Sequence, residues 1–326
     1  MSVKFRNISI GLLALFFILA FINLNIGFTD LNFTDFFSSD ESTSLIAQLR
    51  INRVIIIFLA GISIPTSGFL MQEYFQNPLA GPEVLGITSV ASLAVASYIF
   101  LTKDFTLPEV LQSGLISMAA FAGSLLLMLI LLAYSKAFTD KTYLIIFGFL
   151  ISALASAIVS LMQVYAQSES LKSYVLWSFG ANNQVTLSQI AIVGALVAVG
   201  MFLCFRSIKP LMGNALGESY AKSFGVNLER LKYLVIICSS LLSASITAFL
   251  GPVLFIGIVV PHFCRMLWNP AQLWQQWILN ILFGACLLEL FSIISELAHW
   301  PINIISSLFG VPVILTMLVK MNRRAV

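Results

Sequence analysis

Long apolar runs, separated by short polar or turn-forming segments, follow one another along the whole chain. A helix that crosses a bilayer needs about 20 mostly apolar residues, because lipid offers its backbone groups no hydrogen-bond partner. Ten runs follow this pattern: 8–27, 50–72, 84–101, 112–134, 143–166, 187–205, 230–250, 257–268, 273–297 and 302–320. We therefore expect an all-α polytopic membrane protein of about ten transmembrane helices, folded as a single domain over 1–326.

Two of the ten runs need separate interpretation. The run 257–268 is short, follows Pro252 and contains Pro261, so it is expected to be a short helix enclosed by the others. The first run follows Lys4 and Arg6, as a signal peptide would. It is long for a signal peptide and no clear small-x-small cleavage site follows, which favours a retained first helix.

The composition supports a membrane protein and excludes several other classes. Apolar residues make up 59% of the chain and charged residues 10%, whereas soluble domains have about 45–50% and about 25%. No basic stripe for nucleic acid is present. The four cysteines lie in apolar runs, and His262 and His299 form no metal-ligand pattern. We expect neither a metal site nor a cofactor.

The placement of the basic residues predicts the orientation. If the N-terminus is inside and ten segments cross, thirteen Lys and Arg lie on the inner side and four on the outer side, which accounts for all 17. The outer four are Arg50, Arg53, Lys103 and Lys172. Cytoplasmic loops carry the excess of Lys and Arg. Both termini are therefore expected in the cytoplasm.

The longest inner loop, from about Arg206 to Lys232, has a helical centre. Residues 215–224 have helical composition, and Gly213 and Gly225 are possible breaks on either side. A short helix lying across the cytoplasmic face could dock a partner. The alternative is a solvated loop.

Four stretches, in order along the chain, resemble one known family. They are Arg50-Ile51-Asn52-Arg53, then Asn77-Pro78-Leu79-Ala80-Gly81-Pro82 with Leu85-Gly86-Ile87, then Leu216-Gly217-Glu218 to Phe224-Gly225-Val226-Asn227, and finally Gly251-Pro252 to Val260-Pro261-His262. Together they resemble the permeases of type II ATP-binding cassette importers for iron-siderophores, haem and cobalamin. The chain departs from the family at Asn52, where proline is usual, and near Ser292, where an arginine is common.

The resemblance assigns roles at the inner side. It implies that an ATPase subunit binds a cytoplasmic coupling helix through Leu216, Gly217, Glu218, Ala221, Phe224, Gly225 and Val226. It also implies an inner gate formed by Asn77, Leu79 and Thr142. A plain tight turn is the alternative for the first two gate residues.

The resemblance also suggests residues along the pathway and at the outer side. Polar residues recur on one face of the fifth run, at Ser152, Ser156, Ser160 and Gln163. In the family this helix lines the path at the dimer axis; the alternative is hydrogen bonding between helices. Arg50 and Arg53 are expected to dock a substrate-binding protein, unless they are interfacial anchors that reach toward headgroups.

These inferences predict a transport function in a bacterial inner membrane. No phosphate-binding loop of the Gly-x-x-x-x-Gly-Lys-Ser/Thr type is present, so the chain is not expected to be an enzyme and ATP hydrolysis would belong to a partner. The expected partners are an ABC ATPase subunit, a substrate-binding protein, a second permease copy or paralogue, and the lipid bilayer. The alternative is a proton-coupled secondary transporter that uses Glu289, a carboxylate deep in an apolar run.

Overall fold

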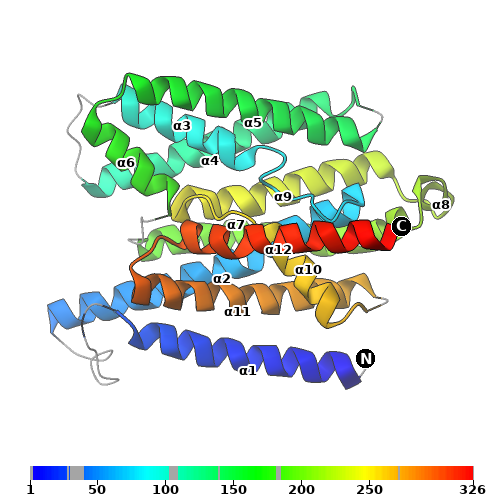
Figure 1. Cartoon of the computed structure of the whole chain (residues 1–326), viewed down its shortest axis with the longest axis horizontal. Coiled ribbons are helices and arrows are strands. Elements are labelled where there is room, and N and C mark those ends of the chain that lie inside the picture. The colour runs from blue at the N-terminus through cyan, green and yellow to red at the C-terminus, as the bar shows by residue number, and fades with distance from the viewer. Residues whose placement is uncertain are drawn as a thin grey trace.

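The fold is a bundle of long α-helices that run roughly along one direction (Figure 1). The computed structural model describes residues 3–27, 29, 40–102, 109–138, 140–180, 185–270 and 272–325. The helices in these ranges are α1 (Val3–Asn25), α2 (Glu41–Phe75), α3 (Ile87–Leu101), α4 (Glu109–Tyr134), α5 (Lys141–Val164), α6 (Ser168–Ser178), α7 (Leu187–Ala215), α8 (Glu218–Ser223), α9 (Leu228–Leu250), α10 (Ile256–Leu267), α11 (Leu273–Ala298) and α12 (Ile302–Ala325).

The predicted membrane segments correspond to ten of these helices. Eight helices are long and apolar enough to cross a membrane, and α3 and α10 are shorter apolar helices. The short helix α10 has a largely buried surface, with Val259, Val260 and Cys264 almost wholly enclosed. The expectation of an all-α polytopic protein with one short, enclosed helix is confirmed.

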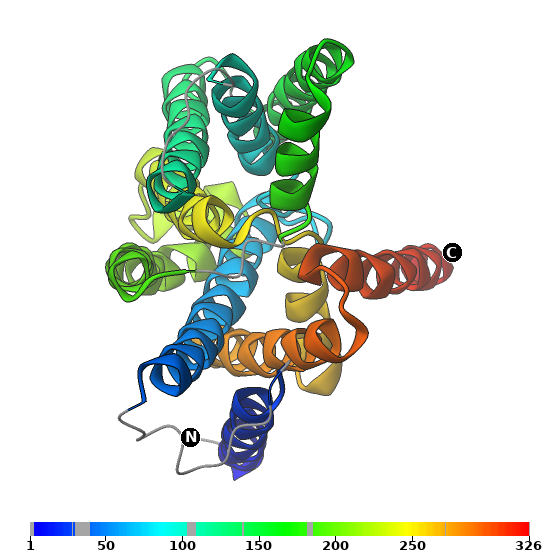
Figure 2. The ribbon, with the colours of Figure 1, turned by 90° about the vertical axis from the view of Figure 1, so that its left-hand side faces the viewer.

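Helix α2 runs through the centre of the bundle (Figure 2). It packs against α11, α9, α10 and α7, while α3 and α4 pack on each other and on α9. Helix α1 lies against α11 at one margin, and α5 lies against α3 at the other. The central helix can therefore pass a displacement at one end to most of the bundle.

The two ends of the bundle differ in what they carry. Helix α8 and both chain termini lie at one end, and α6 lies at the opposite end (Figure 1). We refer to these as the α8 end and the α6 end. The shared location of the termini agrees with an even number of crossings.

The helices of the centre approach closely at glycines. A Cβ added at Gly68 of α2 would overlap the carbonyl oxygen of Gly257 in α10. At Gly61, a Cβ would lie 2.7 Å from the Cα of Ala285 in α11. Small residues allow the two backbones to approach this closely. Membrane helices depend on such close packing, because the hydrophobic effect contributes little to association between helices that are already in lipid.

Two helix boundaries differ most from the sequence-based expectation, and one helix was not predicted. Helix α2 begins at Glu41 rather than near residue 50, because Asp40 caps it by accepting from the Thr43 backbone N–H. Helix α7 continues through Pro210 to Ala215, ten residues beyond the apolar run 187–205 that predicted it. Helix α6 was not predicted, because it is short and its first turn is polar, so it does not form an apolar run. Its buried residues are Tyr174 and Trp177.

The glycine contact predicts a site where one methyl group destabilises the bundle. Gly68→Ala should destabilise the protein by about 1–3 kcal/mol or more, because the new Cβ overlaps backbone that cannot rotate away. Thermal unfolding of the detergent-solubilised protein measures the effect. Gly194→Ala is the matched control, since a Cβ there would meet nothing within 4 Å. Equal melting temperatures for the two variants would contradict this account of the α2–α10 contact.

Candidate functional site

The predicted coupling helix is present as α8, a single helical segment of 6 residues. Gly217 precedes it with φ 103°, and Gly225 follows it with φ 76°. Side chains with a Cβ rarely adopt such angles, so the two glycines allow the chain to turn at both ends. The first break is at Gly217 and not at Gly213, because Gly213 belongs to the last turn of α7. The expected helix 215–224 is therefore shorter than the sequence suggested.

Large apolar side chains are exposed on α8 and in the residues that flank it. Leu216 is 64% exposed, Tyr220 65% and Phe224 72%, while Ala221 is fully buried against the rest of the bundle. The backbone N–H of Val226 donates to the Ala221 carbonyl at 2.9 Å and fixes the return of the chain. Clustered large apolar side chains at a polar helix end are typical of a surface that binds another protein.

Lys141, the first residue of α5, connects three other elements at the α8 end. Its ammonium group lies 3.1 Å from a Glu218 carboxylate oxygen on α8 and donates to Asn214 Oδ1 of α7 at 2.8 Å. It also lies 4.9 Å from the centre of the Tyr74 ring of α2. Exposed ion pairs contribute only about 0–1 kcal/mol. The arrangement is therefore better suited to positioning α8 than to stabilising the fold.

Asn214 joins the end of α7 to the end of α2. Its buried side-chain amide donates to the backbone carbonyls of Glu73 and Tyr74 at 3.3 and 3.1 Å. The backbone carbonyl of Asn214 accepts from Gln76 Nε2 at 2.8 Å. The last carbonyls of a helix have no partner within the helix, so this side chain completes the end of α2. Asn214 therefore links α7 directly to the end of α2.

The end of α2 is also tied to α10. Arg265 pairs with Glu73 at 2.8 Å and donates to Gln72 Oε1 at 2.8 Å. Glu73 thus links α10 to the helix end that Asn214 holds from the other side. Four helices and α8 are connected by this polar network at the α8 end.

The predicted gate residues lie next to that network. Gln76 ends α2 with φ 50°, and Asn77 Oδ1 accepts from the Leu79 backbone N–H at 2.9 Å. Asn77 therefore shapes the following turn and does not itself cap the helix. Thr142 follows Lys141, and its backbone N–H donates to Asp140 Oδ1 at 2.8 Å. The Thr142 backbone N–H, and secondarily its hydroxyl, lower the pKa of the exposed Asp140 carboxyl.

Sequence reasoning missed Lys141 and Asn214 as the residues that connect α8 to the ends of α7 and α2. Asn214 is fully buried, although it follows the apolar run in what looked like an exposed loop. The available signal was weak: a lysine after a helix-capping Asp140, and an asparagine shortly before a glycine. Neither pattern identifies which distant element it will contact.

The polar stripe of α5 lies on a helix at the margin of the bundle. Ser156 and Ser160 are exposed, and Ser152 and Gln163 are partly buried. The Ser160 hydroxyl donates to the Ser156 carbonyl at 2.9 Å, within its own helix. Helix α5 packs on α3, so its other side is available to a second copy. The pathway-lining role of the stripe stays a prediction.

Arg50 and Arg53 lie within α2 and face α1. Arg50 donates to the carbonyls of Leu24 and Asn25 at 3.2 Å each. Arg53 donates to the Asn23 carbonyl at 2.6 Å and pairs with Glu296 of α11 at 2.8 Å. The sequence predicted that these arginines would lie in the first turn of the helix. Because α2 begins at Glu41, they lie within it and hold the end of α1 against α2. Their role in docking a binding protein stays a prediction.

Glu289, the residue on which the alternative function depends, is fully buried between α1 and α11. Its carboxylate accepts from Asn23 Nδ2 at 2.6 Å, and the same amide lies 3.1 Å from the Ser292 hydroxyl. These contacts satisfy one of the two carboxylate oxygens of Glu289, and the other, Oε1, is buried without a hydrogen-bond partner among the described residues. No relative or solved structure reported below supports proton-coupled transport.

Comparison with known proteins agrees with this arrangement. The chain is 29% identical to the hemin transport system permease protein HmuU of Yersinia pestis over 323 residues, which covers 96% of this chain and 95% of that protein. It is 30% identical to the vitamin B12 import system permease protein BtuC of Vibrio parahaemolyticus over 281 residues, 85% and 83% of the two chains. These relatives are transport permeases, not enzymes.

Solved structures and the family pattern lead to the same conclusion. A metal-chelate type ABC transporter in an inward-facing conformation superposes with a TM-score of 0.83 and 25% identity, covering 97% of this chain and 99% of that one. PsaBC from Streptococcus pneumoniae shares the fold alone, with a TM-score of 0.57 and 17% identity over 87% and 93% of the two chains. The pattern of the FecCD transport family matches residues 14–320. The chain therefore belongs to the FecCD transport family and is a multi-pass permease of an ABC importer.

Proposed function

We propose that the chain forms the translocation pathway for an iron-chelate, as a siderophore complex or haem, or for cobalamin. A substrate-binding protein would deliver the cargo, and a separate ATPase subunit would supply the energy. Family membership supports the importer class, and the relatives named for hemin and vitamin B12 support a large metal chelate as cargo.

The observation that carries the proposal is the attachment of α8 to the rest of the bundle. We infer that the ATPase subunit binds Leu216, Gly217, Glu218, Ala221, Phe224, Gly225 and Val226, with the exposed side chains among them forming the contact. A rigid element can move packed helices as one body. The route inward would run from Glu218 through Lys141 and Asn214 to the end of α2. That end leads directly into the gate residues Asn77 and Leu79.

A second permease copy, identical or paralogous, would complete the pathway. Helix α5 is the candidate surface, because α3 is the one described helix on which it packs extensively. Its stripe of Ser152, Ser156, Ser160 and Gln163 would then face the dimer axis. Polar faces of membrane helices point at other helices or at water.

The orientation follows from the basic residues. The α8 end, with both termini, would face the cytoplasm, as the excess of Lys and Arg on that side requires. The binding protein would then approach the α6 end, where Arg50 and Arg53 lie. Because both guanidinium groups already donate to α1 carbonyls, carboxylates of the binding protein would have to compete for them.

Transport should depend on the partner ATPase. We expect liposomes that hold the chain with its ATPase and binding protein to take up haem, a ferric siderophore or cobalamin only when ATP is present. The chain alone, tested with the same three cargoes under a proton gradient, should take up none. Uptake driven by the proton gradient and lost in Glu289→Gln would establish the secondary transporter instead.

The positive φ of Gly225 predicts a selective defect. Gly225→Val should weaken ATPase association about 5- to 30-fold, because a left-handed conformation costs an ordinary residue roughly 1–2 kcal/mol. Gly225→Asn should bind nearly as wild type, since asparagine tolerates this region. A pull-down with the ATPase measures both, and the amount in the membrane fraction controls for insertion. Wild-type binding by the valine variant would remove α8 from the coupling route.

The orientation can be tested with a membrane-impermeant maleimide. Lys136→Cys, at the α8 end, should react only after the membrane is permeabilised. Ser168→Cys, at the start of α6, should react in intact cells, because it faces the outer side. The four native cysteines are buried, so the unsubstituted chain is the control. Labelling of both positions from the same side would show that the threading is wrong.

A further inference from the structure

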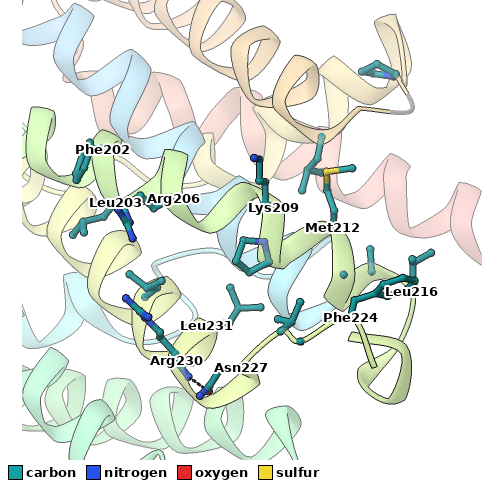
Figure 3. A pocket seen from close by; sticks show the side chains of 18 residues that line it. Phe202, Leu203, Arg206, Lys209, Met212, Leu216, Phe224, Asn227, Arg230 and Leu231 are labelled. Atoms are coloured by element: carbon teal, nitrogen blue, oxygen red, sulfur yellow. Dashed lines mark hydrogen bonds between the residues drawn. The ribbon is translucent and has the colours of Figure 1, made fainter. Parts of the chain in front are cut away.

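A pocket of about 1110 Å³ lies between α7 and α9, and its lining includes Leu216, Phe224, Gly225 and Val226, which flank α8 and belong to the proposed ATPase contact (Figure 3). Three cationic side chains line it: Arg206 and Lys209 from α7, and Arg230 from the first turn of α9. No Asp or Glu is among the described residues that line it. The neighbouring pocket around Lys141, in contrast, is lined by both signs, including Asp140, Glu218 and Glu229. The α7–α9 pocket is therefore selectively positive.

The three cations are available to a ligand. All three residues are exposed. Lys141, Arg53 and Arg265 each form an ion pair with a carboxylate. Within the described ranges, the side chains of Arg206, Lys209 and Arg230 form no such ion pair. Glu229, next to Arg230 in sequence, accepts from the Tyr233 hydroxyl at 3.1 Å and lines the other pocket. The positive charge of the α7–α9 pocket is thus not neutralised from within the described chain.

Apolar and charged residues follow one another along the pocket in a fixed order. Phe202 and Leu203 line it one turn of α7 before Arg206, and they lie further from the α8 end. The apolar surface continues beyond the pocket along α7, where Val199 is 52% exposed. An amphiphile with a negative head and an apolar tail matches this order. A cytoplasmic protein could reach the cations but not the apolar surface further along α7.

We propose that this pocket binds a phospholipid with an anionic head group. Its phosphate would lie among Arg206, Lys209 and Arg230, and its acyl chains would follow Phe202 and Leu203 along α7. Basic pockets between membrane helices on the cytoplasmic side bind anionic lipids, and each cation near the surface strengthens this attraction. The inference rests on the proposed orientation, which puts the pocket at the inner leaflet. A bound lipid would brace α7 close to Asn214 and α8.

The test compares two variants that each remove two positive charges at the same end of the bundle. Arg206→Gln/Arg230→Gln removes cations of the pocket, and Lys4→Gln/Arg6→Gln removes cations of α1. Native mass spectrometry of the purified chain, titrated with phosphatidylglycerol and then with phosphatidylcholine, measures lipid binding. ATPase pull-down is measured separately on the same preparations, so failure of the lipid site and failure of the proposed function give different results.

We expect the pocket variant to bind phosphatidylglycerol about 30-fold more weakly, since each cation contributes about a factor of five. The α1 variant should bind it as wild type does, and phosphatidylcholine should bind weakly to all three. Inorganic phosphate should not displace the lipid, because it lacks the acyl chains. Equal phosphatidylglycerol binding by the two variants would overturn the proposal. Loss of ATPase association with unchanged lipid binding would assign the pocket to the ATPase contact instead.

Discussion

The absence of water in the hydrocarbon core is the constraint on which this structure depends. A backbone amide or carbonyl that finds no partner there costs several kcal/mol, so the chain must cross the membrane as helices. The long helices meet this requirement internally. Two exceptions depend on their neighbours. Helix α10 has only 12 residues and lies enclosed by other helices, and two carbonyls in the last turn of α2 accept from the Asn214 side chain of α7.

The same constraint explains how the helices hold together. Lipid tails are as apolar as leucine, so close packing and hydrogen bonds replace the hydrophobic effect as the source of association. Gly68 and Gly257 bring the α2 and α10 backbones together. The Ser67 hydroxyl, next in sequence, donates to the Ser239 carbonyl of α9 at 3.0 Å. Helix α2 therefore contacts its neighbours through backbone and small polar side chains, and it is held firmly along its length.

Because α2 is firmly packed, contacts made at the α8 end are connected to the centre of the bundle. A short helix with an exposed apolar side is attached through Lys141 and Asn214 to the terminus of the central helix. Few of these contacts are strong individually, but all of them involve the last residues of α2, just before the turn that contains the predicted gate residues Asn77 and Leu79. The cationic pocket on the other side of α7 lies beside the same attachment. A partner and a lipid would thus act on neighbouring parts of one helix end.

Sequence by itself determined the number of apolar helices, the short helix predicted at 257–268 (α10) and the position of α8, because each depends on local composition and on glycine or proline. It did not determine that Gly213 would stay in α7 or that α2 would begin at Glu41. Only the tertiary structure decided that Arg53 would pair with Glu296, and that Lys141, Asn214 and Tyr74 would meet. These contacts join residues far apart in the chain, and their formation depends on helix packing. A local pattern does not indicate which distant side chain will complete a helix end. The sequence therefore could not show that Arg50 and Arg53, which were expected to dock a partner, also bond to α1 and α11.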